Sequence, residues 1–187
     1  MRVIAGSARR LELITPKGSD VRPTTDRIKE TLFNMIQNEV PGARFLDLFA
    51  GSGGIGIEAL SRGASFCAFA DSDSRSISCV RANLAHTRLE DRAQVLACDY
   101  RKALSRLRKS DPFDIIFLDP PYGSGCDADA VRIIEREGLL ADDGMIIVEA
   151  RLNDDYTDVI PASFTIVREK LYKTNKHVFL RKEHQDL

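Results

Sequence analysis

The chain has 187 residues, of which 43% are apolar and 29% charged, and this is ordinary for a single globular domain with a substantial core. No window approaches the roughly 20 apolar residues of a membrane span, and residues 1–6 turn polar too soon for a signal peptide. The net charge of −1 hides basic ends, because residues 1–44 carry an excess of Lys and Arg and 168–182 hold six basic residues against one acid.

The first 43 residues predict an arm that precedes the main domain. Two short strand-like runs, residues 2–5 and 11–15, flank a turn and predict a β-hairpin. A helix follows a loop at 16–20; we expect Thr24 or Thr25 to cap it and its end to fall near Asn38. Basic ends of this kind suit an anionic partner, although a short charged run is also compatible with an ordinary solvated surface.

From residue 44 onward, strand-like and helix-like segments alternate, which predicts a parallel sheet with helices on both faces. Helices are expected to begin near residues 54, 73, 100 and 127. The expected strands are 44–49, 66–71, 93–97, 113–118 and 144–149, followed by an antiparallel hairpin of 163–171 and 176–181 at the sheet edge. The prediction is an α/β fold, a mostly parallel, doubly wound, seven-stranded sheet that forms a domain of residues 44–187 behind an arm of residues 1–43.

A glycine-rich segment, residues 47–56, follows the first of these strands and opens a helix. Its glycines at 51, 53 and 56 fit the G-x-G-x-x-G spacing, which permits a tight turn and close approach of a ligand to the backbone. Alone the spacing is weak evidence. Asp71, twenty residues after Gly51, ends the next strand, where an acid typically binds ribose hydroxyls. The alternative is that Asp71 caps the next helix together with Ser72 or Asp73.

A second motif, Asp119-Pro120-Pro121-Tyr122, follows the buried run 113–118. Two prolines cannot continue a sheet, so the chain leaves the strand there, at the edge where open α/β sheets bind ligands. Asp119 and a proline carbonyl can accept hydrogen bonds from an exocyclic amino group, and Tyr122 can stack on the base that carries it. The tetrapeptide alone is also compatible with a simple turn that exposes a tyrosine.

The four cysteines, Cys67, Cys79, Cys98 and Cys126, show no C-x-x-C spacing and form no ligand pattern with the three histidines. We therefore expect buried free thiols, no metal site, and a reducing cytoplasm as the location.

With its terminal antiparallel hairpin, this layout resembles the Rossmann-like methyltransferases that use S-adenosylmethionine. The resemblance implies a cofactor cleft in which Asp71 binds the ribose and the strand end at 98–100 meets the adenine amino group. The cofactor-binding residues so implied are Asp47, Gly51, Gly53, Asp71, Ser72, Asp99, Tyr100 and Asp119. The catalytic residues so implied are Asp119, Pro120 and Tyr122.

More narrowly, the chain resembles the bacterial 16S ribosomal RNA guanine-N2 methyltransferases, which methylate guanine 966. The segments that carry this likeness are residues 1–6, 22–27, 30–34, 58–64 and 117–123. Asp71 and Cys98 depart from the family, which often has Glu and Gly there. The likeness implies 16S ribosomal RNA within the small subunit or its precursor as the partner. We expect a monomer, because the sequence shows no large apolar face. The RNA-binding residues we expect are Arg9, Arg10, Arg22, Thr25 and Arg27.

Three rival hypotheses remain open at this point. An adenine-N6 or protein-glutamine methyltransferase would use the same type of tetrapeptide, but such enzymes often begin it with Asn and usually carry a large recognition domain. An NAD-dependent oxidoreductase would explain the glycine spacing and Asp71, but not the Asp-Pro-Pro-Tyr motif. A non-catalytic RNA-binding assembly factor would not need the acids at 47, 71, 99 and 119.

Overall fold

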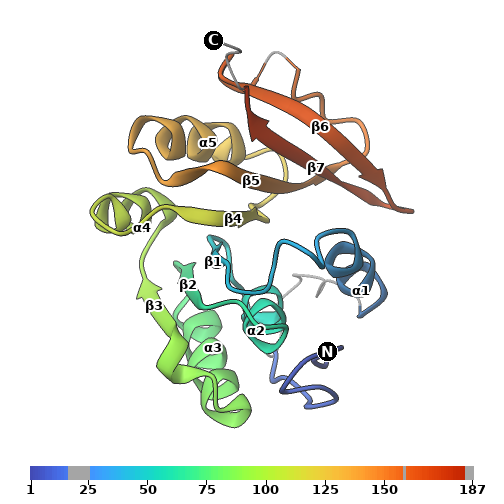
Figure 1. Ribbon diagram of the computed structural model, residues 1–187, viewed down its shortest axis with the longest axis vertical. Coiled ribbons are helices and arrows are strands. Elements are labelled where there is room, and N and C mark those ends of the chain that lie inside the picture. Colours follow the sequence, from blue (N-terminus) through green and yellow to red (C-terminus); the bar gives the residue numbers. More distant parts are fainter. Residues whose placement is uncertain (17–25, 158, 184–187) are drawn as a thin grey trace.

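The computed structural model describes residues 1–16, 26–157 and 159–183. Seven strands form one sheet in the order β3-β2-β1-β4-β5-β7-β6 (Figure 1), and this confirms the predicted doubly wound fold. The strands are β1 (Arg44–Asp47), β2 (Phe66–Asp71), β3 (Ala93–Ala97), β4 (Phe113–Leu118), β5 (Leu140–Arg151), β6 (Phe164–Leu171) and β7 (Asn175–Lys182). The first five run parallel to one another, whereas β7 pairs antiparallel with both β5 and β6.

Within the described residues, one helix precedes β1, and four helices and a short 3₁₀ turn connect the parallel strands. They are α1 (Asp26–Met35), α2 (Gly54–Ser61), α3 (Ser74–Thr87), η1 (Glu90–Arg92), α4 (Tyr100–Leu107) and α5 (Cys126–Arg136). Two of them begin at an aspartate whose side chain accepts a backbone N–H of the first turn, Asp73 for α3 and Asp99 for α4. Helices α1, α2 and α3 lie on one face of the sheet and α4 and α5 on the other (Figure 1).

The inner strands β1, β2, β4, β5 and β7 are largely buried on both faces, as their nearly continuous apolar runs predict, whereas the edge strands β3 and β6 are more exposed. Along β4, Ile115 and Phe117 enter the core beneath α1–α3, while Ile116 and Leu118 enter the core beneath α4 and α5. This alternation follows from the two-residue period of a strand. The cores on the two faces hold the carboxyl ends of β1, β4 and β5 in a fixed register, and these ends carry the site described below.

The N-terminal arm is a tight loop docked on α2 rather than a pair of full strands. A single bridge joins Arg2 to Glu12, so the predicted strands are shorter than expected. The arm's turn approaches the end of α2, where the Ser7 N–H donates to the Ser61 carbonyl over 2.8 Å. Gly6, with φ +83°, passes so close that an added Cβ would lie 1.8 Å from that carbonyl oxygen. Only glycine fits here.

A buried acid, Glu58 of α2, fastens the arm and α1 to the domain. Its carboxylate accepts the backbone N–H groups of Ile4 and Ala5 over 2.8 and 3.0 Å. It also pairs with the ammonium of Lys29 at 3.3 Å and the guanidinium of Arg62 at 2.7 Å. Burial lowers the pKa of Lys29, and the adjacent carboxylate opposes that shift. Every acceptor direction of Glu58 is thus used inside the protein.

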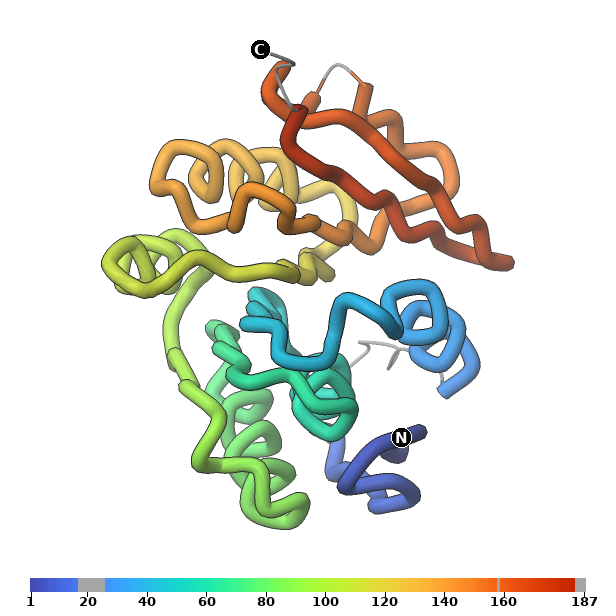
Figure 2. The backbone as a smooth tube through the Cα atoms, viewed as in Figure 1, coloured from blue at the N-terminus to red at the C-terminus, as the bar shows by residue number. Residues whose placement is uncertain are grey.

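The chain path sets the arm and the terminal hairpin apart, with the arm's dark blue tube and the red β6–β7 hairpin at opposite ends of the view (Figure 2). Arm residues such as Val3 and Leu13 nevertheless share a core with α1, α2 and the sheet. The division of the chain at residue 44 therefore stays a prediction. No helix in the described ranges is long and apolar enough to cross a membrane.

Several details differ from the sequence expectations. Helix α1 ends at Met35 rather than near Asn38, and β5 is longer than the expected strand 144–149. The expected caps of α1, Thr24 and Thr25, lie outside the described residues. All four cysteines lie in the described part and are free thiols, but only Cys67 is buried. The expectation of burial was wrong for Cys98 and Cys126, which sit at the end of β3 and the start of α5, and for Cys79, which is only partly covered in the middle of α3.

Candidate active site

A cavity of about 1490 Å³ opens at the carboxyl ends of the parallel strands. It lies where the connections turn to opposite sides of β1, which is the switch point at which doubly wound sheets bind ligands. Sites for a single small ligand usually occupy roughly 300–1000 Å³. The cavity therefore has room for a cofactor and part of a second molecule. Its wall includes the glycine loop, Asp71, Asp119 and the turn between β6 and β7.

The glycine loop is held by a buried acid at its base. Asp47, 1% exposed, accepts the backbone N–H of Gly56 over 2.9 Å. Its burial raises the pKa of its carboxyl to about 7, against the hydrogen bond from Gly56 and with the help of the Asp71 charge. Gly53 takes a left-handed φ of +80° at the start of α2. The loop thus presents backbone to the cavity, as the glycine spacing predicts.

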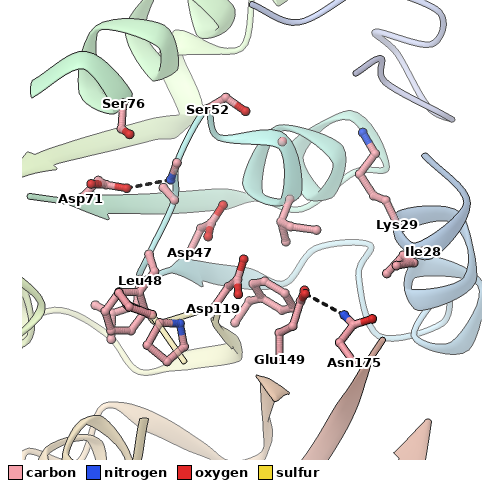
Figure 3. Close-up of a pocket in the computed structure, with 18 of the residues that line it drawn as sticks. Ile28, Lys29, Asp47, Leu48, Ser52, Asp71, Ser76, Asp119, Glu149 and Asn175 are labelled. Carbon is pink, nitrogen blue, oxygen red and sulfur yellow. Dashed lines mark hydrogen bonds between the residues drawn. The ribbon is translucent and has the colours of Figure 1, made fainter. Parts of the chain in front are cut away.

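Asp71 stands at the end of β2 and lines the same cavity. Its two carboxylate oxygens accept the backbone N–H groups of Gly51 and Asp73, both over 2.8 Å, and the first of these bonds is drawn in Figure 3. The cap of α3 is Asp73, not Asp71. A carboxylate offers about four acceptor directions, so Asp71 keeps capacity for ligand hydroxyls. Ser72 is exposed beside it in the cavity wall.

An aromatic pair closes the cavity beside β3. The rings of Phe49 and Tyr100 lie 5.5 Å apart, and the Tyr100 hydroxyl donates to Asp129 over 2.8 Å. Burial raises the pKa of Tyr100 to about 12, which keeps it a donor. Asp99 caps α4 and pairs with Lys102 at 3.5 Å. Sequence reasoning selected Asp99 and Tyr100 but missed Phe49, whose position directly after β1 could have indicated it.

Asp119 leaves the end of β4 toward the cavity, beside Asp47 and Glu149 (Figure 3). Burial raises the pKa of the Asp119 carboxyl well above its ordinary range, and the charges of Glu149 and Asp47 raise it further. Pro120 is buried, whereas Tyr122 is 45% exposed at the rim. The guanidinium of Arg151 lies 5.4 Å from the centre of the Tyr122 ring. The predicted acid and aromatic residue therefore face one cavity.

A polar cluster from β5 and β7 completes the site, and sequence reasoning missed it. Glu149 lies among Asn175, His177 and Tyr122, at 2.7, 3.4 and 3.4 Å. The His177 ring also meets the Tyr172 hydroxyl at 3.1 Å. One signal was available, because Glu149 is the single charge in the apolar run 145–150. A buried carboxylate in a central strand is rare unless it has polar partners.

The predicted RNA-binding residues do not gather in one place. Arg9 and Arg10 are exposed on the arm's turn, which docks at the last residues of α2, at the far end of that helix from the glycine loop. Arg27 is exposed on α1 and lines the cavity. Arg22 and Thr25 lie outside the described residues. Their contact with RNA stays a prediction.

The doubly wound sheet, the glycine loop after β1, the acid after β2 and the Asp-Pro-Pro-Tyr turn after β4 define the Rossmann-like methyltransferase fold. Residues 1–181 match the family described as Conserved hypothetical protein 95, and the chain belongs to that family.

Relatives of known name agree with this placement. Ribosomal RNA small subunit methyltransferase D of Escherichia coli K12 is 36% identical over 171 residues, 91% of this chain and 84% of the relative. The protein of the same name from Haemophilus influenzae is 32% identical over 91% of this chain and 88% of its own length. Among solved structures, Escherichia coli yhhF superposes with a TM-score of 0.87 at 34% identity, covering 99% of both chains.

A more distant structure, TrmN from Thermus thermophilus, has a TM-score of 0.67 at 22% identity and covers 83% of this chain and 48% of its own. That likeness shows a shared fold.

Proposed function

We propose that this protein transfers the methyl group of S-adenosylmethionine to the N2 amino group of a guanine in 16S ribosomal RNA, guanine 966 by resemblance. One observation carries the proposal: Asp119, in its Asp-Pro-Pro-Tyr turn, faces the cavity that the glycine loop and Asp71 also line. The name of the Escherichia coli relative supports ribosomal RNA as the substrate class. The enzyme is expected to work as a cytoplasmic monomer on the small subunit or its precursor.

The cavity fits the proposed cofactor in shape and chemistry. Gly51, with φ +53°, has open space where a Cβ would stand, so a ligand can approach its backbone. Asp71 has acceptor capacity for the two ribose hydroxyls, and the Phe49–Tyr100 pair offers an apolar wall for an adenine ring. When bound, S-adenosylmethionine supplies an electrophilic methyl group on a positively charged sulfur.

The chain's own residues would bind and orient the nucleophile. The N2 lone pair of guanine is delocalised into the ring, which makes the amino group a poor nucleophile. Hydrogen bonds accepted by Asp119 and by the Pro120 carbonyl would localise that lone pair and aim it across the cavity. Tyr122, half-exposed at the rim, would stack on a base flipped out of its RNA helix. As the methyl bond to N2 forms, the bond to sulfur breaks, and the extra proton on N2 would leave afterwards, so no strong general base is required. Most of the acceleration would then come from positioning.

The test is transfer of tritium from labelled S-adenosylmethionine onto small ribosomal subunits that lack the methyl group. Digestion to nucleosides should place the label in N2-methylguanosine, and subunits methylated beforehand should accept none. Label in N6-methyladenosine or in ribosomal protein would instead support the rival acceptors. No label in either type of subunit, with cofactor binding intact in calorimetry, would favour a non-catalytic assembly factor.

A further inference from the structure

Glu149 occupies a place beside the proposed amino-group acceptor. Strand β5 pairs with β4 in parallel register, Leu118 beside Val148, so the next residues along, Asp119 and Glu149, are neighbours at the strand ends. Both side chains extend into the same cavity (Figure 3). Neighbouring strands lie about 4.8 Å apart. The spacing of the two strands thus sets the two side chains next to each other, and two neighbouring carboxyl groups can accept hydrogen bonds from two adjacent donors on one edge of a flat ring.

Residues of β7, on the side of Glu149 away from β4, fix the orientation of its carboxylate. Its Oε1 accepts the Asn175 amide over 2.7 Å, and its Oε2 lies 3.4 Å from Nε2 of fully buried His177. To make this bond, the Asn175 amide points its oxygen away from Glu149 (Figure 3), and among the described residues that buried oxygen has no hydrogen-bond partner. A buried oxygen without a partner is unfavourable. The fact that Asn175 keeps this orientation indicates that its amide N–H group holds the Glu149 carboxylate.

The chemistry of the purine edge identifies what such an acceptor pair can distinguish. Next to its N2 amino group, guanine carries an N1–H, which donates. Adenine and 2-aminopurine carry an unprotonated N1 there, whose lone pair would face a carboxylate. A site built to bond a substrate N–H strongly rejects an analogue that lacks it, because the protein's buried polar group is left unpaired.

We propose that Glu149 accepts the N1–H of the target guanine and so selects guanine over purines with an unprotonated N1. The inference rests on the proposed function, in which Asp119 accepts from N2. Glu149 would be a specificity-determining residue, with Asn175 and His177 as its positioning residues. Its acceptor role is independent of the cofactor, because Asp71 and the glycine loop approach the cavity from β1 and β2.

The experiment compares guanine with 2-aminopurine at the position that the wild-type enzyme methylates. Small subunits are assembled from RNA that carries either base there, and kcat/KM is measured for the wild type and for Glu149→Gln. The wild type should discriminate against 2-aminopurine by at least about 100-fold. The glutamine amide can donate to the unprotonated N1, so Glu149→Gln should narrow that ratio at least about tenfold. 2-Aminopurine also lacks the O6 of guanine, but that difference is the same for both enzymes. The change in the ratio between wild type and Glu149→Gln therefore reports the contact at N1.

Two controls separate the possible failures. Glu137→Gln, at the end of α5 and outside the cavity lining, should keep the wild-type ratio. Calorimetry should show unchanged cofactor affinity for Glu149→Gln, which also verifies its folding. An unchanged preference in a folded Glu149→Gln enzyme would overturn this inference and leave the proposed function standing. No transfer to guanine by the wild type would overturn both.

Discussion

The protein buries two groups of acids, and they are built in opposite ways. Glu58, fully buried, meets two cations and two backbone N–H groups. Asp47, Asp119 and Glu149 instead crowd together at the strand ends, and within the described ranges no Lys or Arg forms an ion pair with them. Burial raises the pKa of both Asp119 and Asp47; the charges of Glu149 and Asp47 raise the pKa of Asp119 further, and the charge of Asp71 raises that of Asp47.

This difference in partners distinguishes Glu58, which stabilises the fold, from the strand-end acids, which are available to bind a ligand. A buried charge is tolerated when it is paired and hydrogen-bonded, and Glu58 meets that condition inside the protein. Asp47 and Glu149 also have hydrogen-bond partners, but in the described residues these strand-end acids have no Lys or Arg counter-charge. Sites with perturbed carboxyl groups in a cleft are candidates for function. The proposed ligands would bring the missing partners, N–H donors from the base and a positive charge from the sulfonium.

The largest effect on stability should come from a substitution of Glu58, the acid that is paired with cations. Glu58→Gln leaves Lys29 buried without its counter-charge, and removal of one partner of a buried pair costs about 3–5 kcal/mol. Thermal unfolding should therefore begin at a markedly lower temperature than in the wild type. Glu39→Gln is the matched control, because Glu39 is exposed and its ion pair with Arg181 spans 3.8 Å. Equal stability of the two variants would mean that Glu58 does not fasten the arm.

The opposite result is expected at the strand ends. Asp119→Asn should reduce methyl transfer by about 10²–10³-fold, comparable with removal of one electrostatic contact to a transition state, without loss of stability. Cofactor affinity, measured by calorimetry, should stay within a few fold. Asp111→Asn, in an exposed loop before β4, serves as the control. A variant that turned over at the wild-type rate would contradict the proposed role of Asp119.

A smaller effect is expected for Asp71, the acid proposed to bind the ribose. Asp71→Ala should weaken S-adenosylmethionine binding by about 1.5–3 kcal/mol, the range for hydrogen bonds to a charged group. Titration calorimetry measures this directly, and Asp73→Ala distinguishes binding from helix capping, because Asp73 caps α3. Equal affinities of the wild type and Asp71→Ala for S-adenosylmethionine would mean that Asp71 only holds the backbone of Gly51 in place.

The smallest effect concerns pH. The pKa of Asp47 is raised from 3.8 to about 7, so the folded protein binds this proton more tightly than the unfolded chain. Stability from this group is complete below about pH 4 and is lost as the pH rises toward 7. The variant Asp47→Asn has no titrating group at this position, so it does not lose this stability as the pH rises. From pH 5 to pH 6 its Tm relative to the wild type should rise by about 2–4 °C; a constant difference would contradict the raised pKa.

Sequence patterns predicted the elements well because the inner strands are largely buried and the helices between them begin at Asp or Gly. They predicted the place of Asp71 and Asp119 at strand ends in the cavity wall because each belongs to a local motif. They could not predict the setting of Glu149, since its partners Asn175 and His177 come from a strand that pairs with β5 only in the folded sheet. The buried pair of Glu58 with Lys29 is hidden for the same reason, being 29 residues apart in the chain.

Helix α2 has a mechanical consequence. Its eight residues span about 12 Å, and its two ends serve different surfaces, the glycine loop at Gly54 and the docked turn of the arm at Ser61. The two surfaces are therefore held at a fixed separation along the axis of α2. If Arg9 and Arg10 bind phosphates, the RNA must extend at least over the length of α2 while its target base reaches the strand ends. A folded RNA surface meets that span more readily than a short linear strand.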